Sequence, residues 1–334
     1  MSCRGLSLMS GGLDSQLAIK VLERAGATME AVCFVTPFFD CSAAEKAAGA
    51  LGVKLHKVDF TDDVLRLVEN PPHGFGGAMN PCIDCHATMI RRAGELMAEL
   101  GFDFVATGEV AGQRPMSQNR QSLGIVERTS GLKGRLVRPL SAQLLEPTAP
   151  ELDGRLDRAQ LLDICGRTRD RQIALAAEFG IVDYPAPAGG CKLTEAGFSR
   201  KLADLKEHEG LSSRRLVELL LVARRFRLPG GTSVLLGRDR NENETLRAVD
   251  FAALGTSAPR LVRPVNVPGP TALLPELGAA ADLALAAALV AAYSKFDRLE
   301  GEIRIQVDAP GEAARELTVP RPYLREPFKE YQIC

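Results

Sequence analysis

Residues 8–15 read Leu8-Met9-Ser10-Gly11-Gly12-Leu13-Asp14-Ser15, and this stretch decides the fold of the chain. It ends a short apolar run and opens a helical pattern with apolar residues at positions 17, 18, 21 and 22. A glycine pair lets the backbone approach a ligand, and the N–H groups and positive dipole end of the following helix face that ligand. We therefore predict a phosphate site, where Ser10 and Ser15 add hydroxyls and Asp14 holds a cation or fixes the loop.

Two other interpretations of this loop are weaker. No lysine follows the glycines, so the loop is not of the GxxxxGK[ST] type. A glycine-serine loop alone is more often an ordinary turn, but the strand before it and the helix after it favour a nucleotide site.

The composition limits the class of protein. A chain of 334 residues has room for two domains, and its net charge of −1 means that a nucleic-acid surface must be local. The apolar run Leu283–Tyr293 is shorter than the roughly 20 residues of a membrane span, so we expect a buried helix and no membrane contact. The eight cysteines, with no secretory signal before them, indicate a reducing, cytoplasmic setting and metal or catalytic thiols rather than disulfides.

Strand and helix patterns alternate over the first 110 residues and predict an α/β fold with a doubly wound parallel sheet. The expected strands are Gly5–Met9, Ala31–Thr36, Lys54–Asp59 and Phe104–Thr107, and the expected helices are Ser15–Ala25, Ala43–Leu51, Thr61–Val68 and Cys85–Leu100. Ligands of such sheets lie at the carboxyl ends of the strands. The glycine loop and Thr107-Gly108-Glu109 should therefore converge there.

Residues 110–140 carry an excess of positive charge. They hold one acid, Glu127, and six basic residues, Arg114, Arg120, Arg128, Lys133, Arg135 and Arg138. We interpret them as a basic loop followed by a strand at Arg135–Leu140. The loop is either a solvated surface or a contact for nucleic-acid phosphates, to which Lys and Arg clusters contribute sequence-independent affinity. Asp157–Phe179 then reads as a helix or a helix pair.

The pattern changes from about residue 198 and indicates a smaller α+β domain. Helical patterns at Phe198–His208 and Ser212–Arg225 precede a hairpin signal at Pro229-Gly230-Gly231. Asn241 suits the N-cap of a helix. The alanine-rich helix and a final strand, Glu302–Asp308, complete the domain.

Three cysteines stand in motifs that suit metal or redox chemistry. Cys82 and Cys85 form a CxxC, which brings two thiols close enough to share a metal or form a redox pair. Both precede a predicted helix, where the dipole lowers a thiol pKa. Cys191 follows a glycine pair. We read Cys33 as a strand-core residue, Cys165 as a buried helix residue, and His73 and His86 as structural histidines.

These motifs carry a family resemblance over residues 5–195. The strings SGGLDS, NPCIDCH, ATGEVAGQRPMSQ, LVRPL and GGCKLT resemble the PP-loop ATP-pyrophosphatases (an adenine nucleotide alpha hydrolase-like fold), particularly the 4-thiouridine synthetases among tRNA thiouridine synthetases. The resemblance implies that ATP and Mg²⁺ adenylate a uridine carbonyl oxygen of tRNA and that sulfur then displaces AMP. The residues implied to bind ATP are Ser10, Gly11, Gly12, Asp14, Ser15, Gly108 and Gln113.

The cysteines resemble those of the iron–sulfur subgroup of this family. There, three cysteines hold a [4Fe–4S] cluster with one open iron, which implies ligand and catalytic roles for Cys82, Cys85 and Cys191, with Asp14 also at the catalytic site. A persulfide pair without metal, or a zinc site that includes His86, are the alternatives. We expect no THUMP module and no rhodanese-like extension, so sulfur would come from an external donor, a cysteine desulfurase or free sulfide.

Residues 216–310 resemble the NFACT-R domain, which is thought to bind RNA. The strings Ala223–Leu228 and Leu236–Asn243 carry this resemblance. It implies RNA contacts, together with the basic loop, at Arg114, Arg120, Arg128, Arg224, Arg225 and Arg227. Surface charge is the alternative interpretation of these arginines.

The expected organisation is a PP-loop domain at 1–195, a helical linker at 196–215, an NFACT-R-like domain at 216–320 and a tail at 321–334. Two other functions stay open. One is a PP-loop ligase or sulfur transferase acting on a small molecule, like the zinc-binding 7-cyano-7-deazaguanine synthases. The other is a non-catalytic, nucleotide-gated RNA-binding or sulfur-relay protein. The sequence does not distinguish C2 from C4 thiolation and does not set the oligomeric state.

Overall fold

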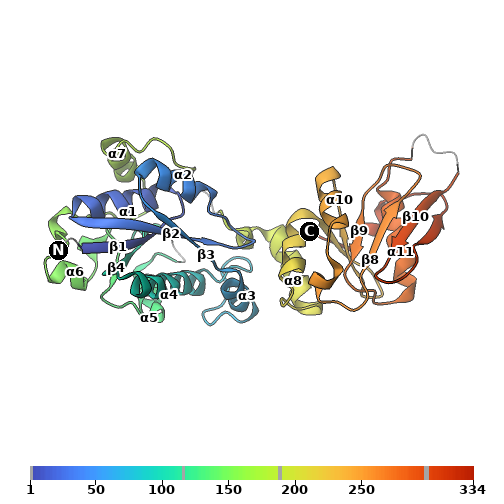
Figure 1. The fold of residues 1–334 in the computed structure, drawn as a ribbon, viewed down its shortest axis with the longest axis horizontal. Coiled ribbons are helices and arrows are strands. Elements are labelled where there is room, and N and C mark those ends of the chain that lie inside the picture. The colour runs from blue at the N-terminus through green and yellow to red at the C-terminus, as the bar shows by residue number, and fades with distance from the viewer. Residues whose placement is uncertain (1–2, 115–116, 187–189, 297–300) are drawn as a thin grey trace. The chain divides into compact units, whose positions relative to one another are not determined.

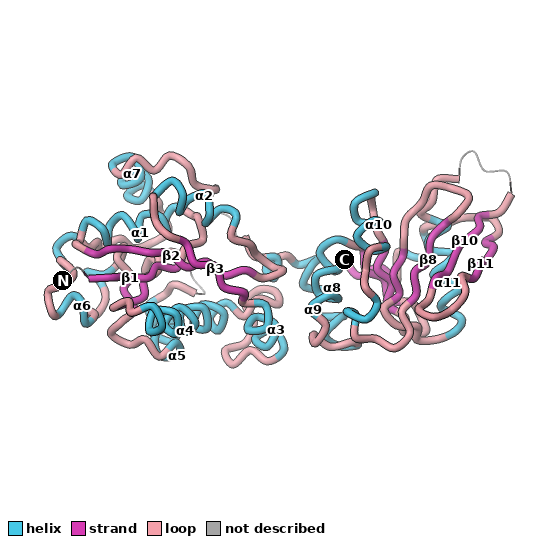
Figure 2. Tube along the Cα trace, viewed as in Figure 1, coloured by secondary structure: helices cyan, strands magenta, loops and turns pink. Residues whose placement is uncertain are grey.

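The computed structural model describes residues 3–114, 117–186, 190–296 and 301–334. The chain forms two compact units, Met1–Lys192 and Leu193–Cys334. Each unit has its own sheet (Figures 1 and 2) and its own hydrophobic core.

The first unit is built on the predicted parallel sheet. Its strands are β1 (Cys3–Leu8), β2 (Ala27–Val35), β3 (Leu55–Asp59), β4 (Phe104–Ala106) and β5 (Leu136–Val137). They lie in the order β3-β2-β1-β4-β5, and every pair is parallel. The strand order reverses at β1, which pairs with both β2 and β4. This confirms the doubly wound fold and creates a switch point, where the loops after β1 and β4 diverge and leave room for a ligand.

Helices cover both faces of this sheet. Figure 1 shows α1 (Leu13–Arg24), α2 (Ser42–Leu51) and α7 (Asp170–Glu178) along one face, and α4 (Cys82–Leu100) and α5 (Arg120–Ser130) along the other. Leu17 and Val21 of α1 are fully buried in one core with Ala31 of β2. Burial of one such side chain contributes about 1.5–3 kcal/mol, so the apolar face of α1 fixes the helix on the sheet. The shorter helices are α3 (Thr61–Glu69), α6 (Ala149–Leu152) and the 3-10 turns Ala142–Leu144 and Arg158–Gln160.

Two segments of the first unit differ from the sequence prediction. The predicted basic loop contains α5, which Asn119 caps by accepting a hydrogen bond from the Ser122 N–H at 2.8 Å. Gly131, with φ 73°, ends it. The predicted helix over 157–179 is helical only in the 3-10 turn and in α7.

The cysteines outside the CxxC also differ from the prediction. Cys33 lies in the core of β2 as expected, but it forms a disulfide with Cys41, so the expectation of thiols only was wrong. Cys41 directly precedes α2, and the turn after β2 brings the two Cα atoms to 6.0 Å, a separation that a disulfide spans. Cys165 is exposed and lies in no helix, because it follows the 3-10 turn in an irregular segment.

The second unit is an α+β domain on an antiparallel sheet, as expected. Its strands are β6 (Arg224–Arg227), β7 (Ser233–Leu236), β8 (Arg260–Pro264), β9 (Ala272–Leu274), β10 (Ile303–Asp308), β11 (Arg315–Val319) and β12 (Gln332–Ile333), in the order β11-β10-β8-β9-β7-β6-β12. Its helices are α8 (Ala196–His208), α9 (Arg214–Val222), α10 (Arg240–Arg247) and α11 (Ala280–Ala292), with 3-10 turns at Phe251–Leu254 and Glu326–Phe328. The predicted hairpin joins β6 to β7, where the Leu228 N–H donates to the Thr232 carbonyl at 2.9 Å.

Three details of this unit differ from the prediction. Asp239, not Asn241, caps α10, because its carboxylate accepts the Glu242 N–H at 3.0 Å. Two more strands follow β10, and the last of them, β12, pairs with β6. The segment expected as a tail therefore closes one edge of the sheet. Among the described residues, no helix combines the length and the apolar character that crossing a membrane requires.

A buried ion-pair network binds α8 to the sheet. Arg225 of β6 has no exposed side-chain surface, and its Nη2 lies 2.6 Å from Glu209 Oε2. Arg227 Nη2 lies 2.8 Å from Asp204 Oδ2 on α8, and Asp204 also accepts a hydrogen bond from Arg225 Nε. Burial alone would raise the pKa of Asp204, but the two arginines lower it. The segment expected as a linker is therefore packed into the second unit.

We predict that Arg225→Ala destabilises this unit by about 3–5 kcal/mol, because it removes a fully buried guanidinium and leaves Asp204 and Glu209 to share Arg227 alone as an arginine partner. Arg240→Ala is the matched control. Arg240 is 88% exposed and pairs with Glu244 at 2.7 Å, so its loss costs about 0–1 kcal/mol. Urea unfolding followed by circular dichroism measures both. Equal midpoints for the two variants would show that the network does not hold α8.

Candidate functional site

The glycine loop after β1 leaves the start of α1 open. Gly12 precedes the helix in extended geometry (φ −70°, ψ 160°), and among the described residues no side chain caps it. Ser15 Oγ donates to the Gly12 carbonyl at 2.7 Å, and Ser10 Oγ accepts the Gly12 N–H at 3.3 Å. Gly11 has φ +79°, and a Cβ there would collide with the Ala43 backbone. The loop thus offers hydroxyls and helix N–H groups to an anion, as predicted.

The loop after β4 meets the glycine loop, as expected from the strand order. A Cβ on Gly108 would lie 2.6 Å from the carbonyl carbon and oxygen of Asp14. Only glycine fits this approach without a shift of the backbone. Gln113 Nε2 then donates to Asp14 Oδ2 at 3.1 Å. The structure therefore brings Gly108 and Gln113 to the glycine loop, residues 10–15, which we call the phosphate loop.

Asp14 has the properties of a cation ligand. Its Oδ1 is buried and has no hydrogen-bond partner in the described chain. Burial raises the pKa of Asp14, against the opposing effects of Gln113, Arg169 and Arg114. A buried carboxylate oxygen without a partner is costly, and Mg²⁺ bound between such a carboxylate and substrate phosphates removes that cost. Arg169, which the sequence analysis did not single out, lies close enough to share this site.

The CxxC opens helix α4. Cys82 is its first residue and Cys85 lies in its first turn, where the Cys85 N–H donates to the Pro81 carbonyl at 2.8 Å. Asn80 Nδ2 donates to Cys82 Sγ at 3.1 Å. Burial raises the pKa of Cys85, and the Cys191 and Cys82 thiols and Asp84 raise it further. We expected the helix dipole to lower the pKa of Cys85, but burial and its neighbours shift this pKa upward.

Two histidines beside the CxxC each pair with a carboxylate. His73 Nδ1 lies 2.6 Å from Asp84 Oδ1, which ties the loop before α4 to the CxxC itself. His86 Nδ1 lies 3.1 Å from Glu109 Oε1. Both therefore pair with buried carboxylates, in line with the structural role expected for them.

Glu109 and Arg138 form a buried ion pair beneath the site. Arg138 Nε donates to Glu109 Oε2 at 2.9 Å, and both side chains are more than 90% buried. Thr107 Oγ1 donates to the same oxygen at 3.1 Å. Sequence reasoning placed Glu109 at a strand end and Arg138 in a basic cluster. Their pairing across 29 residues had no local signal in the sequence.

The three motif cysteines lie near one another. Cys82, Cys85 and Cys191 are each half-buried, and Cys82 and Cys191 are close enough to Cys85 to raise its pKa. Within the described ranges, no group of three or more His, Cys, Asp or Glu side chains is placed to hold a metal ion.

The arginines proposed for RNA fall into two groups. Arg114, Arg120 and Arg128 are exposed, and Arg120 and Arg128 lie at the two ends of α5. Arg225 and Arg227 lie in the internal network of the second unit. Arg224 is half-buried, with its guanidinium 5.0 Å from the centre of the Tyr293 ring. Only the first group offers side chains that already face solvent.

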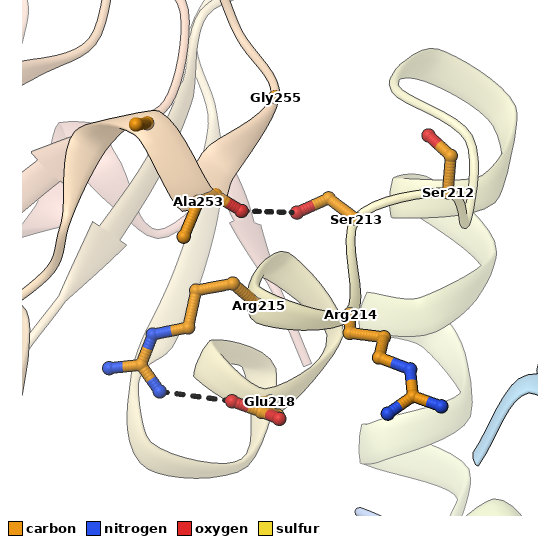
Figure 3. A pocket seen from close by; sticks show the side chains of 8 residues that line it. Ser212, Ser213, Arg214, Arg215, Glu218, Ala253 and Gly255 are labelled. Atoms are coloured by element: carbon orange, nitrogen blue, oxygen red, sulfur yellow. Dashed lines mark hydrogen bonds and ion pairs between the residues drawn. The ribbon is translucent and has the colours of Figure 1, made fainter.

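An open pocket of about 510 Å³ lies at the start of α9 in the second unit (Figure 3). Its lining includes Ser212, Ser213, Arg214, Arg215 and Gly255. Ser213 Oγ donates to the Ala253 carbonyl at 3.3 Å, and Arg215 Nη1 donates to Glu218 Oε2 at 3.0 Å. The Ser213 hydroxyl and the Arg215 guanidinium thus already have hydrogen-bond partners. The residues that line this pocket resemble neither the glycine loop nor the cysteine motifs of the first unit.

Comparisons with known families match one segment in each unit of the chain. Residues 4–130 match the family described as the tRNA methyl transferase HUP domain. Residues 223–332 match the NFACT protein RNA binding domain. The chain joins a PP-loop HUP domain to an NFACT-type domain. This confirms the two resemblances found in the sequence.

Curated relatives of the HUP domain are named tRNA-specific 2-thiouridylase MnmA. The protein of Roseiflexus sp. (strain RS-1) is 27% identical over 204 residues, which are 54% of this chain and 54% of that protein. The protein of Marinobacter nauticus is 31% identical over 124 residues, which are 33% of this chain and 32% of that protein. The chain thus spans between about a third and about a half of these relatives.

Two solved structures share parts of the fold. One is a 4-thiouridine synthetase–RNA complex with bound ATP, with 20% identity and a TM-score of 0.39 over 65% of this chain and 52% of that chain. The other is a predicted subunit of tRNA methyltransferase from Methanocaldococcus jannaschii, with 16% identity and a TM-score of 0.35 over 53% of this chain and 76% of that chain.

Glu109 makes the first unit acid-sensitive. Burial alone would raise the pKa of Glu109, but Arg138 and His86 lower it from 4.5 to about 2. A lowered folded-state pKa stabilises the fold above the unfolded-state pKa, and this stabilisation is lost as the pH falls through the folded-state pKa. We predict that the free energy of unfolding lost in Glu109→Gln is largest above pH ~4.5 and shrinks toward pH ~2.

Denaturant unfolding of parent and variant across this pH range measures the difference. Glu178→Gln is the matched control, because Glu178 pairs with Arg24 at 3.2 Å and is 59% exposed. Its effect should be small, within about 1 kcal/mol, at every pH. A cost of Glu109→Gln that stays constant down to pH ~2 would contradict the assignment of the charged carboxylate.

Proposed function

We propose that the chain is an ATP-dependent tRNA sulfurtransferase that adenylates a uridine carbonyl oxygen and replaces that oxygen with sulfur. One observation carries the proposal. Gly108 contacts the phosphate loop. The next residue, Glu109, pairs with His86 on α4, the helix that carries the CxxC. A nucleotide on the loop and sulfur chemistry at the thiols therefore share one edge of the sheet. The relatives named tRNA-specific 2-thiouridylase support the same reaction class.

The reaction has two bond exchanges. The uridine carbonyl oxygen forms a bond to the α-phosphorus of ATP, and the bond from that phosphorus to pyrophosphate breaks. Sulfide then forms a carbon–sulfur bond, and AMP leaves with the original oxygen. The first exchange turns a poor leaving group into a good one, so the enzyme must stabilise charge on the departing pyrophosphate.

The phosphate loop supplies that stabilisation. Ser10, Gly11, Gly12 and Ser15 present hydroxyls and N–H groups to the phosphates, and Asp14 would hold Mg²⁺ through its unpartnered oxygen. Gly108 lets the second loop approach, and Gln113 keeps the other oxygen of Asp14 in place. These residues bind and orient ATP. Their hydroxyl and N–H groups are already in position before the substrate binds.

Cys82, Cys85 and Cys191 would hold the [4Fe–4S] cluster. When bound by three cysteines, such a cluster supplies one iron with an open position for a sulfur ligand. The half-buried thiols shelter that position from water, and Asn80 fixes the Cys82 sulfur. The sulfur comes from an external donor, a cysteine desulfurase or free sulfide. A cytoplasmic location keeps these three thiols reduced.

We place the tRNA contact of the first unit at the exposed arginines Arg114, Arg120 and Arg128, and a second contact on the NFACT-type domain at Arg224. Arg225 and Arg227 would have to leave their carboxylate partners to reach a phosphate. We therefore assign them to the fold of that domain.

We predict that Asp14→Asn strongly lowers the rate of tRNA-dependent pyrophosphate release, because a neutral amide binds Mg²⁺ much more weakly than a carboxylate does. Gly108→Ala should lower the rate by at least about tenfold, since its methyl group pushes the two loops apart. Gly49→Ala is the matched control, because a Cβ there meets no atom within 4 Å. Nucleoside analysis by chromatography and mass spectrometry distinguishes 2-thiouridine from 4-thiouridine in the product. An unchanged rate in Asp14→Asn would remove the assignment of the loop.

We further predict that Cys82→Ala, Cys85→Ala and Cys191→Ala each lose bound iron and thiolation together after anaerobic reconstitution with iron and sulfide. Cys165→Ala, at an exposed cysteine, serves as the control and should keep both. A persulfide mechanism would need only two of the three cysteines and no metal, whereas a zinc site would also need His86. Full iron content and full thiolation in any one of the three variants would exclude the three-ligand cluster.

A further inference from the structure

The four residues of β6 divide between the two faces of the antiparallel sheet. Because the side chains of a strand alternate between faces, Arg225 and Arg227 share the face that carries the buried ion-pair network. Phe226 lies on the opposite face, in the hydrophobic core that also contains residues of α11. Arg224 shares that face with Phe226, so it points away from the carboxylates that pair with its neighbours.

Tyr293 takes the place of a carboxylate beside Arg224. It directly follows α11, and the centre of its ring lies 6.1 Å from the centre of the Phe226 ring. The guanidinium carbon of Arg224 lies 5.0 Å from the centre of the Tyr293 ring, a distance at which an aromatic ring attracts a cation. The ring therefore positions the guanidinium group but does not neutralise its charge.

Arg325, from the C-terminal segment, contacts the same ring. Its guanidinium carbon lies 4.8 Å from the centre of the Tyr293 ring, and its Nε donates to the Ala292 carbonyl at 3.0 Å. Ala292 is the last residue of α11, where the helix dipole favours a cation. Arg325 is exposed, so a ligand can reach its side chain.

A third arginine extends this surface. The guanidinium carbon of Arg321 lies 5.8 Å from the centre of the Phe296 ring and 5.6 Å from the centre of the Tyr323 ring. Tyr323 is buried, whereas Arg321 is exposed. Phe296 follows Tyr293 by three residues, so the two groups of arginine and aromatic side chains are neighbours at the end of α11.

The domain does not neutralise the charges of Arg224 and Arg325. In the described part of the chain, neither guanidinium group has a carboxylate within ion-pair distance. Arg240 and Arg304, two exposed arginines of the same unit, pair with glutamates instead. A guanidinium group without a carboxylate can bind a phosphate through two parallel hydrogen bonds, and guanidinium and aromatic side chains stack on unpaired bases.

We propose that Arg224, Arg321 and Arg325, held against Tyr293 and its neighbouring rings, form a binding surface for single-stranded RNA. All of these residues lie within the segment 223–332 that matches the RNA binding domain. The inference rests on the proposed function only for the identity of the RNA, an unpaired loop or end of the tRNA. The guanidinium groups bind phosphates, and the half-buried Tyr293 ring contacts an unpaired base, which a duplex would keep stacked inside.

Fluorescence anisotropy of a labelled single-stranded RNA of about 12 nucleotides tests this surface with the full chain. We expect Arg224→Gln/Arg325→Gln to weaken binding and to lower the slope of log affinity against log salt by about 0.7 for each lost phosphate contact. Arg224→Lys/Arg325→Lys keeps both charges, so it should keep the slope. Tyr293→Leu should also keep the slope, but it should lower the affinity at least about fivefold at every salt concentration, because a stacking contact is lost.

Arg240→Gln/Arg304→Gln is the matched control, because it removes the same charge from the same unit. Arg240 is 88% exposed and Arg304 is 54% exposed, and each has a glutamate partner. This control should keep the salt slope of the parent chain. An equal loss of slope in both glutamine variants would show that overall charge binds the RNA and would overturn the surface. Equal affinity of the parent for an RNA duplex of the same length would overturn the assignment to single strands.

Binding and thiolation are measured separately, so the two proposals can fail separately. If the parent thiolates tRNA but Arg224→Gln/Arg325→Gln binds RNA as the parent does, the proposed function stands and this surface is overturned. If RNA binding depends on Arg224 and Arg325 but tRNA causes no pyrophosphate release, the surface stands and the proposed function is overturned.

Discussion

The close approach of Gly108 to the start of α1 is the constraint on which the site depends. Parallel strands β1 and β4 bring their carboxyl ends to the same edge, but only the missing side chain of Gly108 lets the second loop touch the Asp14 backbone. The next residue, Glu109, extends to the other side and holds His86 of α4. Two consecutive residues thus fix the phosphate loop and the CxxC helix to one turn, so neither can move far without the other.

This arrangement explains why charged side chains are buried beneath the candidate site. Glu109 and Arg138 lose hydration, which is costly, but each is paired and hydrogen-bonded. Asp14 is different, because one of its oxygens has no partner in the described chain. The satisfied pair makes the floor of the site rigid, and the unsatisfied oxygen marks the place where a ligand must complete it.

The sequence predicted the parts of the fold that local patterns encode. Strand and helix patterns alternate along the first unit, as expected for a parallel sheet, and the position of the loops at the carboxyl ends of the strands followed from this topology. Helix α5 was missed because the charges of Arg120 and Arg128 dominated the interpretation of this segment, although Asn119 and Gly131 give start and stop signals. The Cys33–Cys41 disulfide and the Glu109–Arg138 pair depend on chain reversals that no local pattern records.

Charge alone was the least reliable guide to function. Arg225 and Arg227 lie in the stretch of sequence that resembles an RNA-binding domain, but their guanidinium groups are already paired with Asp204 and Glu209. Asp204 lies on α8, and Glu209 directly follows that helix. Both precede β6 in the chain, so they come close to Arg225 and Arg227 only when the chain is folded. Of the six arginines that the resemblance and the basic loop suggested for RNA, those that the fold leaves exposed are Arg114, Arg120 and Arg128. They lie in and before α5, on the residues that follow the loop of Gly108 and Gln113.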